Sequence, residues 1–106
     1  MTNEFDIDIP SLRAATGVSY TEAKMLQLLM KEEIATHQKL LEAGLVTRTR
    51  QLMWALRNKL DNLGITIVND FDIGYSIPLK YKLRLKNIIT GEIEDELNKV
   101  SIANRL

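Results

Sequence analysis

The fold of this chain depends above all on the stretch THQKLLEAGLVTRTRQLMWALRNKLDNLGITIVNDFDIGYSI, residues 36–77. At its start, Thr36 can cap a short helix that ends at about Leu41, because a threonine hydroxyl accepts a hydrogen bond from an amide of the first turn. Gly44 stands where a helix end needs a left-handed residue. These signals predict a short helix followed by a tight turn.

A longer helix is expected over residues 48–62, with Thr47 as its cap and Gly64 as its stop. At about 100° per residue, one stripe of this helix should face the core; it comprises Thr49, Met53, Leu56 and Leu60. The side chains expected on the other side are Thr47, Arg48, Gln51, Trp54, Ala55 and Asn58. Arg57 lies closer to the core stripe, so we expect it to bond a carbonyl or an acidic partner.

A hairpin should follow this helix. Two apolar pairs, Ile65 with Ile67 and Tyr75 with Ile77, bracket the turn at residues 69–72. Apolar residues that alternate on both sides of a polar turn are typical of two paired strands. Pro78 should end the second strand, because proline has no amide to donate to a sheet.

Several signals precede residue 36. Residues 19–22 read Ser-Tyr-Thr-Glu, a capping box in which the serine hydroxyl and the glutamate carboxylate each accept a bond from the other residue's amide. The helix that follows, residues 20–33, is apolar on most sides and should lie at the centre of the domain. Residues 5–9 alternate between apolar and acidic, which predicts a strand. Residues 10–15 can start a helical turn that Gly17 interrupts.

The C-terminal part is more ambiguous. Residues 79–86 alternate strictly, which favours a strand whose one face carries Lys80, Lys82, Arg84 and Lys86. Such a face would extend a phosphate-binding surface or keep an edge strand soluble. The apolar spacing of this segment also suits a helix. Residues 91–99 predict a short acidic helix.

The chain as a whole suits one domain. Its 106 residues support a single core, which we place over about residues 19–78, with residues 79–106 as an extension. The start is acidic and polar, there is no cysteine, and no stretch approaches the roughly 20 apolar residues that cross a bilayer. We therefore expect a cytoplasmic protein with no membrane partner. Fourteen basic and fourteen acidic residues cancel, but basic residues dominate residues 37–60.

Catalysis and metal binding find no support in the sequence. His37 is the only histidine and no cysteine accompanies it, so a metal site has no basis. Glu32 and Glu33 are neighbours on a predicted helix and diverge, so they do not form a catalytic pair. Glycine-rich phosphate loops and nucleophile motifs are also missing. We expect no enzyme activity, no cofactor and no metal.

The predicted order of elements is that of a winged helix-turn-helix, an α+β fold with three core helices and a C-terminal hairpin, the wing. Three motifs in that order resemble the DNA-binding effector domain of the OmpR/PhoB family of response regulators: TEA at residues 21–23, LRNKL at residues 56–60 and IGYSI at residues 73–77. The resemblance covers about residues 21–77 and implies that residues 48–62 enter the major groove of DNA. The resemblance does not extend to a receiver domain, and we expect none. By analogy, a small domain of this kind suits a phage or mobile-element regulator of transcription.

The expected interface with double-stranded DNA lies mainly on that helix. Arginine pairs with guanine, and glutamine or asparagine with adenine, through two hydrogen bonds, so the base-contact candidates are Arg48, Gln51 and Asn58. Phosphate contacts position a protein without specifying sequence, and the candidates for them are Arg50, Lys39 and Lys59. Thr47 and Trp54 complete the predicted set.

Two features leave a protein partner open. Trp54 could contact a thymine methyl group or a sugar edge, anchor a protein interface, or pack under the wing or the C-terminal segment. Asp70 and Asp72 place two carboxylates in the hairpin turn, where they would repel phosphates. They could instead face a protein partner or a second copy of the chain. A protein-interaction module on a winged-helix scaffold is therefore the alternative.

Overall fold

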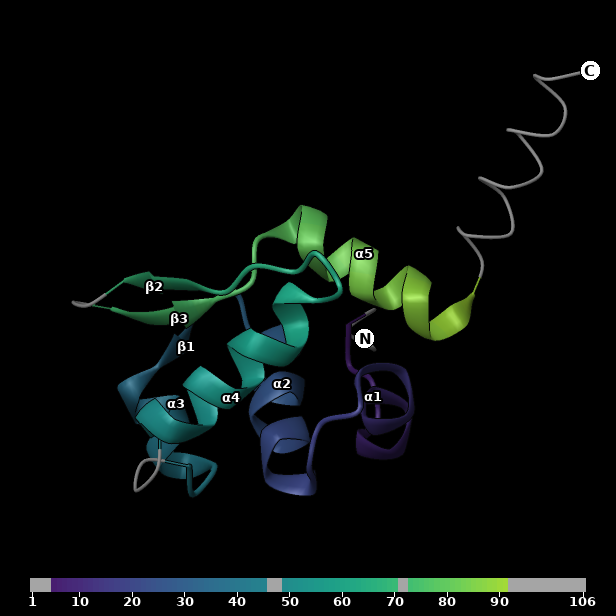
Figure 1. Cartoon of the computed structure of the whole chain (residues 1–106). Coiled ribbons are helices and arrows are strands. Elements are labelled where there is room, and N and C mark those ends of the chain that lie inside the picture. The colour runs from purple at the N-terminus through teal and green to yellow at the C-terminus, as the bar shows by residue number, and fades with distance from the viewer. Residues whose placement is uncertain (1–4, 46–48, 71–72, 92–106) are drawn as a thin grey trace, which may run out of the picture.

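Five helices and a three-stranded antiparallel sheet form the part of the chain that the computed structural model describes, residues 5–45, 49–70 and 73–91 (Figure 1). In chain order the elements are α1 (Ile9–Thr16), α2 (Tyr20–Lys31), β1 (Ala35–Thr36), α3 (His37–Glu42), α4 (Thr49–Asp61), β2 (Val68–Asp70), β3 (Gly74–Ser76) and α5 (Leu79–Thr90). The expected α+β class is confirmed. Figure 1 shows the β2–β3 hairpin projecting at one end of the molecule, with α1 toward the other.

The predicted capping box starts α2, the central helix. Ser19 Oγ accepts a hydrogen bond from the Glu22 amide at 3.2 Å, and Glu22 Oε1 accepts one from the Ser19 amide at 2.7 Å. The apolar residues of α2 that are buried are Ala23, Met25, Leu26, Leu29 and Met30. The helix ends at Lys31, earlier than expected, because Glu32 is already extended and leads the chain toward β1.

The two predicted helices are present as α3 and α4, and residues 46–48 of the turn between them lie outside the described residues. Thr36 Oγ1 accepts a hydrogen bond from the Lys39 amide at 3.3 Å, and Gly44 has a left-handed φ of 73°. The core stripe of α4 is confirmed, with Thr49 half-buried and three members buried: Met53, Leu56 and Leu60. The predicted cap Thr47 and the first predicted helical residue, Arg48, lie outside the described residues.

The sheet contains one strand that the sequence pattern did not reveal. β1 is only two residues long and pairs with β3, which also pairs with β2, so the strand order is β1-β3-β2. Two residues show no alternation, so only the partner strand defines β1. The predicted hairpin is confirmed, but its strands are shorter than expected. Ile65 and Ile67 are buried ahead of β2 instead of pairing within it.

The strand predicted over residues 5–9 is wrong. Asp8 accepts a hydrogen bond from the Ser11 amide at 3.0 Å and thereby caps α1, which begins at Ile9. Phe5 is buried in the core. An alternating apolar and polar pattern indicates which side chains are buried. A strand also needs a neighbouring strand to bond its backbone N–H and C=O groups, and these residues have none in the described part of the chain. The helical turn predicted over residues 10–15 is confirmed as part of α1.

The basic strand predicted over residues 79–86 is also wrong, because these residues form most of α5. Four apolar side chains of this helix meet the core: Tyr81, Leu85, Ile88 and Ile89. Residues spaced by two diverge on a helix, so the four basic side chains share no common face. The core therefore reaches past residue 78 into α5. Apart from Gly91, the acidic helix predicted over residues 91–99 lies outside the described residues.

Two basic side chains of α5 cap the ends of other helices. Lys82 Nζ donates a hydrogen bond to the Glu32 carbonyl at 2.9 Å, at the end of α2. Arg84 Nε donates one to the Leu63 carbonyl at 2.7 Å, just beyond α4. Positive charge at a helix C-terminus complements the helix dipole. Burial lowers the pKa of Lys82, and the neighbouring carboxylates of Glu33 and Glu32 oppose that shift.

Candidate nucleic-acid interface

The side of α4 that faces away from the core is an exposed polar face. It presents four of the residues that the sequence assigns to DNA: Arg50, Gln51, Trp54 and Asn58. The Trp54 residue is 71% exposed, so neither β2–β3 nor α5 covers it; residues 92–106 of the C-terminal segment lie outside the described residues. Within the described residues, the polar side chains of this face make no hydrogen bond or ion pair. They are available to a ligand. The other two candidates on this helix, Thr47 and Arg48, lie outside the described residues.

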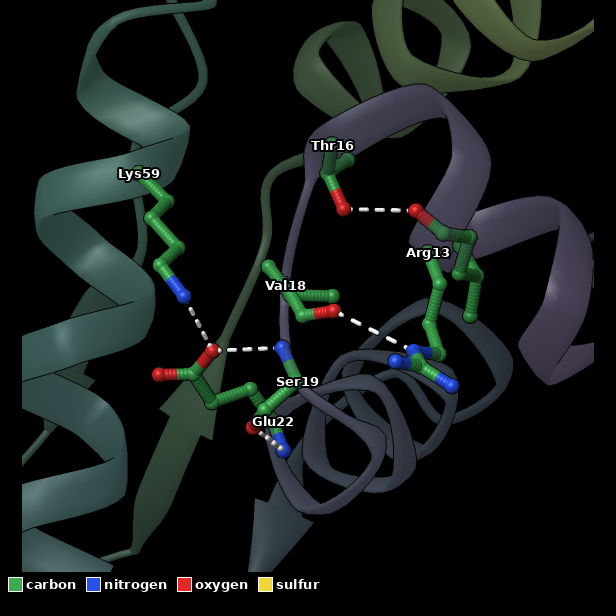
Figure 2. A network of polar contacts seen from close by, with 7 residues as sticks. Arg13, Thr16, Val18, Ser19, Glu22 and Lys59 are labelled. Atoms are coloured by element: carbon green, nitrogen blue, oxygen red, sulfur yellow. Dashed lines mark hydrogen bonds and ion pairs between the residues drawn. The ribbon is translucent and has the colours of Figure 1, made fainter.

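The opposite side of α4 is held by packing and by polar links on both flanks. On one flank, Arg57 Nη2 donates a hydrogen bond to the Ile67 carbonyl at 3.4 Å, so the predicted bond to a carbonyl is confirmed. On the other flank, Lys59 Nζ lies 2.6 Å from Glu22 Oε1 of α2. Figure 2 shows how this ion pair joins α4 to the capping box of α2. The outward face is therefore presented by a firmly positioned helix.

The electrostatics of this link have opposing parts. Burial favours the neutral form of Glu22 and raises its pKa. The bonds from Lys59 and from the Ser19 amide lower the pKa, and together they outweigh the effect of burial. The net pKa of Glu22 lies below its ordinary value. Glu22 is therefore charged at neutral pH, and its carboxylate serves α2 and α4 together.

The two lysines predicted to contact phosphate already have carboxylate partners. Lys59 pairs with Glu22, and Lys39 Nζ lies 2.6 Å from Glu32 Oε2. Both lysine side chains are partly exposed, 39% for Lys39 and 40% for Lys59, so phosphate contact stays a prediction for each. At either lysine, a DNA phosphate would have to compete with the carboxylate that the lysine already pairs with. Arg50 has no such carboxylate partner among the described residues.

The structure brings α4 and the hairpin together around an open hollow of about 360 Å³. Its lining comprises Arg50, Met53, Trp54, Arg57, Asn69 and Tyr75. Asn69 of β2 and Tyr75 of β3 are directly opposite each other in the sheet, so one cross-strand pair closes the hollow on the hairpin side. Asp70, at the end of β2, is exposed, whereas Asp72 lies outside the described residues.

Sequence reasoning did not connect Asn69, Tyr75 or Arg57 with the interface. Only the pairing of β2 with β3 and the placement of the hairpin against α4 bring Asn69 and Tyr75 to Arg50 and Arg57. One signal was present: Arg50 and Arg57 are seven residues apart, about two helical turns, and such residues lie on the same side of a helix.

Other classes of site have little basis in the described residues. No group of three or more His, Asp or Glu side chains there could hold a metal ion. No helix in the described ranges has the length and apolar character needed to cross a membrane. Comparison of the chain with models of protein families, with curated proteins and with solved structures finds no match.

Proposed function

We propose that this protein binds double-stranded DNA in a sequence-specific manner, with α4 in the major groove. In this proposal the fold is a winged helix-turn-helix, in which α3 and α4 form the helix-turn-helix and β2–β3 is the wing. The element order and the placement of β3 between β1 and β2 support this interpretation. By analogy with the regulators that the sequence resembles, we further propose that the DNA-bound protein regulates transcription.

The observation that carries the proposal is the exposed polar face of α4. One side of this helix is buried and tied to α2 and the hairpin segment, while Gln51 and Asn58 point away with no partner among the described residues. The two residues are seven apart, so both lie on one side and can meet base edges together. Their amides can each bond adenine at two atoms. The major groove, about 12 Å wide, admits a helix of this kind.

Removing the amides should weaken specific binding. We expect Gln51→Ala and Asn58→Ala each to lose about 1–3 kcal/mol, or about 5- to 150-fold, on the preferred duplex. Binding to random duplexes should change little, because that binding depends on phosphates. The preferred duplex is first selected from a random pool with the wild-type protein, and affinities are then measured by fluorescence anisotropy.

The matched control for this experiment is Asn87→Ala on α5, which removes an amide far along the chain from α4. It should bind like the wild type. If Gln51→Ala and Asn58→Ala also bind the selected duplex like the wild type, α4 does not read bases.

The exposure of Trp54 favours one second candidate, a protein-interaction surface centred on this residue. Exposed tryptophans are frequent anchors of protein interfaces. Salt separates the two functions: DNA affinity should fall steeply as salt rises, whereas an interface anchored by Trp54 should be far less sensitive. A Trp54→Ala variant that keeps duplex affinity but loses self-association or partner capture would favour the second candidate.

The acidic turn gives a further prediction for DNA binding. Replacing Asp70 and Asp72 by asparagine should tighten nonspecific binding at low salt, because two charges that repel phosphates are removed. The gain should shrink as salt rises, since exposed charges are screened within about 10 Å at 0.1 M. Unchanged DNA affinity together with weaker self-association would show that these carboxylates face protein instead.

A further inference from the structure

We infer that the hollow between α4 and the hairpin holds one phosphate group of the DNA backbone, with Arg50 and Arg57 as its cations. This inference rests on the proposed function. It places Arg50, which the sequence already assigned to phosphate contact, in a shared site with Arg57 and the hairpin, which the sequence did not connect with DNA. It also gives Arg57 a second role beyond its bond to the Ile67 carbonyl.

The positions of the two arginines favour a shared anion. Arg50 and Arg57 lie on the same side of α4, about 10 Å apart along its axis, and both line the hollow. Trp54 stands between them in sequence and forms part of the same wall. Arg57 is held in place by its bond to the Ile67 carbonyl, whereas Arg50 is exposed. The long side chain of Arg50 can therefore turn toward a group that Arg57 also contacts.

The polar character of the hollow matches an anion. None of the six residues that line it carries a negative charge. Across from the arginines, Asn69 offers amide hydrogens and Tyr75 offers a hydroxyl, both as neutral donors. A phosphate presents several acceptor oxygens, and a guanidinium can bond two of them at once. The hollow is thus lined by donors that an anion with several oxygens would satisfy.

The guanidinium of Arg57 is left incompletely bonded by the protein. Its Nε–H is buried and has no acceptor among the described residues, and the bond from its Nη2 to the Ile67 carbonyl is long at 3.4 Å. An unpaired buried donor is unfavourable, and more so on a charged group. The guanidinium of Arg57 lines the hollow, so a phosphate oxygen bound there can offset its positive charge.

This geometry divides α4 into two functional sides. The outward side, with Gln51 and Asn58, faces the bases in the proposed complex. The edge of this outward face next to the hairpin, where Arg50 lies above the half-buried Arg57, contacts one backbone strand through the hollow. The hairpin then contributes uncharged donors near the sheet and does not depend on its acidic turn for phosphate contact.

The test compares Arg57→Gln with Arg13→Gln in full-length protein. Arg13 is a matched control, because its Nε also donates to a main-chain carbonyl, that of Val18, at 3.4 Å, and α1 lies away from the hairpin (Figure 1). Duplex affinity is measured over a range of salt concentrations. Arg57→Gln should lower the slope of log affinity against log salt by about 1, as loss of one phosphate contact does. Arg13→Gln should leave the slope unchanged.

A second measurement locates the phosphate and does not depend on how well Arg57→Gln folds. Duplexes are made in which one phosphate at a time is replaced by an uncharged methylphosphonate. At one position the methylphosphonate should lower the affinity of the wild-type protein. At that position it should not lower the affinity of Arg50→Gln, a mild change at an exposed residue. Arg57→Lys, which keeps the charge, should retain most of the wild-type salt slope.

The outcomes separate the two levels of the proposal. If the wild type binds duplex DNA and folded Arg57→Gln shows the same salt slope as the wild type, the phosphate site is overturned. The proposed function is not affected by that result. The phosphate site is equally overturned if Arg50→Gln senses every methylphosphonate as the wild type does. Wild-type protein that shows no salt-dependent duplex binding overturns the proposed function itself.

Discussion

Replacing Gly74 by alanine is expected to lower the free energy of unfolding by at least about 3 kcal/mol, from the combined effects of a strained backbone and an overpacked contact. Gly74 has a φ of 151°, and a Cβ atom at this position would overlap the Ala35 carbonyl oxygen. The overlapping atom belongs to the backbone, so the overlap cannot be relieved by rotating a side chain. Relief requires β1 to separate from β3, because Gly74 is paired with Thr36 in that ladder.

Thermal and denaturant unfolding of Gly74→Ala measure this loss. The control is Gly17→Ala, whose φ of 73° is also left-handed but whose Cβ would meet nothing within 4 Å. That variant should lose only the intrinsic cost of the left-handed conformation, about 1–2 kcal/mol. Equal losses in the two variants would show that the close approach of β1 to β3 does not matter for stability.

Replacing Glu22 by alanine is expected to lower the free energy of unfolding by about 2–3 kcal/mol, because it removes half of a capping box and leaves the Ser19 amide without its acceptor. The ion pair with Lys59 contributes less to the free energy of unfolding than its short distance suggests. The Lys59 side chain is 40% exposed, so solvent screens the pair. The loss should be measured by denaturant unfolding at neutral pH. A matched control, Glu42→Ala, removes an exposed carboxylate from α3 and should have a much smaller effect.

The same site makes a pH prediction through Glu22→Gln. The pKa of Glu22 in the folded protein is lowered from an ordinary value of 4.5. A lowered folded pKa contributes stability above the unfolded pKa, and this contribution disappears as the pH falls through the folded pKa. The stability gap between wild type and Glu22→Gln should therefore be constant near neutral pH and narrow below about 4.5. A gap that does not change between pH 7 and pH 3 would contradict the assigned charge state.

Local signals in the sequence were sufficient for much of the fold. Capping residues and glycines act within one helical turn, so the starts of α2 and α3 and the left-handed residue at Gly44 could be predicted from the neighbouring residues alone. The core side of α4 was equally predictable, because an α-helix has one fixed period and Met53, Leu56 and Leu60 follow it. For the candidate interface, the same periodicity identified Gln51, Trp54 and Asn58 as outward-facing.

Segments whose pattern fits two periods could not be assigned in this way. Residues 79–86 alternate like a strand, yet their apolar members also fall on one side of a helix, and packing against α1 and the core selects the helix. Residues 5–9 alternate as well, but backbone pairing needs a partner strand, and Asp8 instead starts α1. In both segments the outcome depended on what lies beside the chain in space.

Neighbouring residues were enough to specify the helices α2, α3 and α4, the position of the hairpin and the polar face of α4. Caps, turns and helical periodicity are local properties. The partners across the fold came only from packing: Glu22 with Lys59, Lys82 with the end of α2, and β1 with β3. Packing also brings Asn69 and Tyr75 to Arg50 and Arg57 around one hollow. These contacts join residues far apart in the chain, and their formation depends on how the helices and the hairpin pack, which no local pattern records.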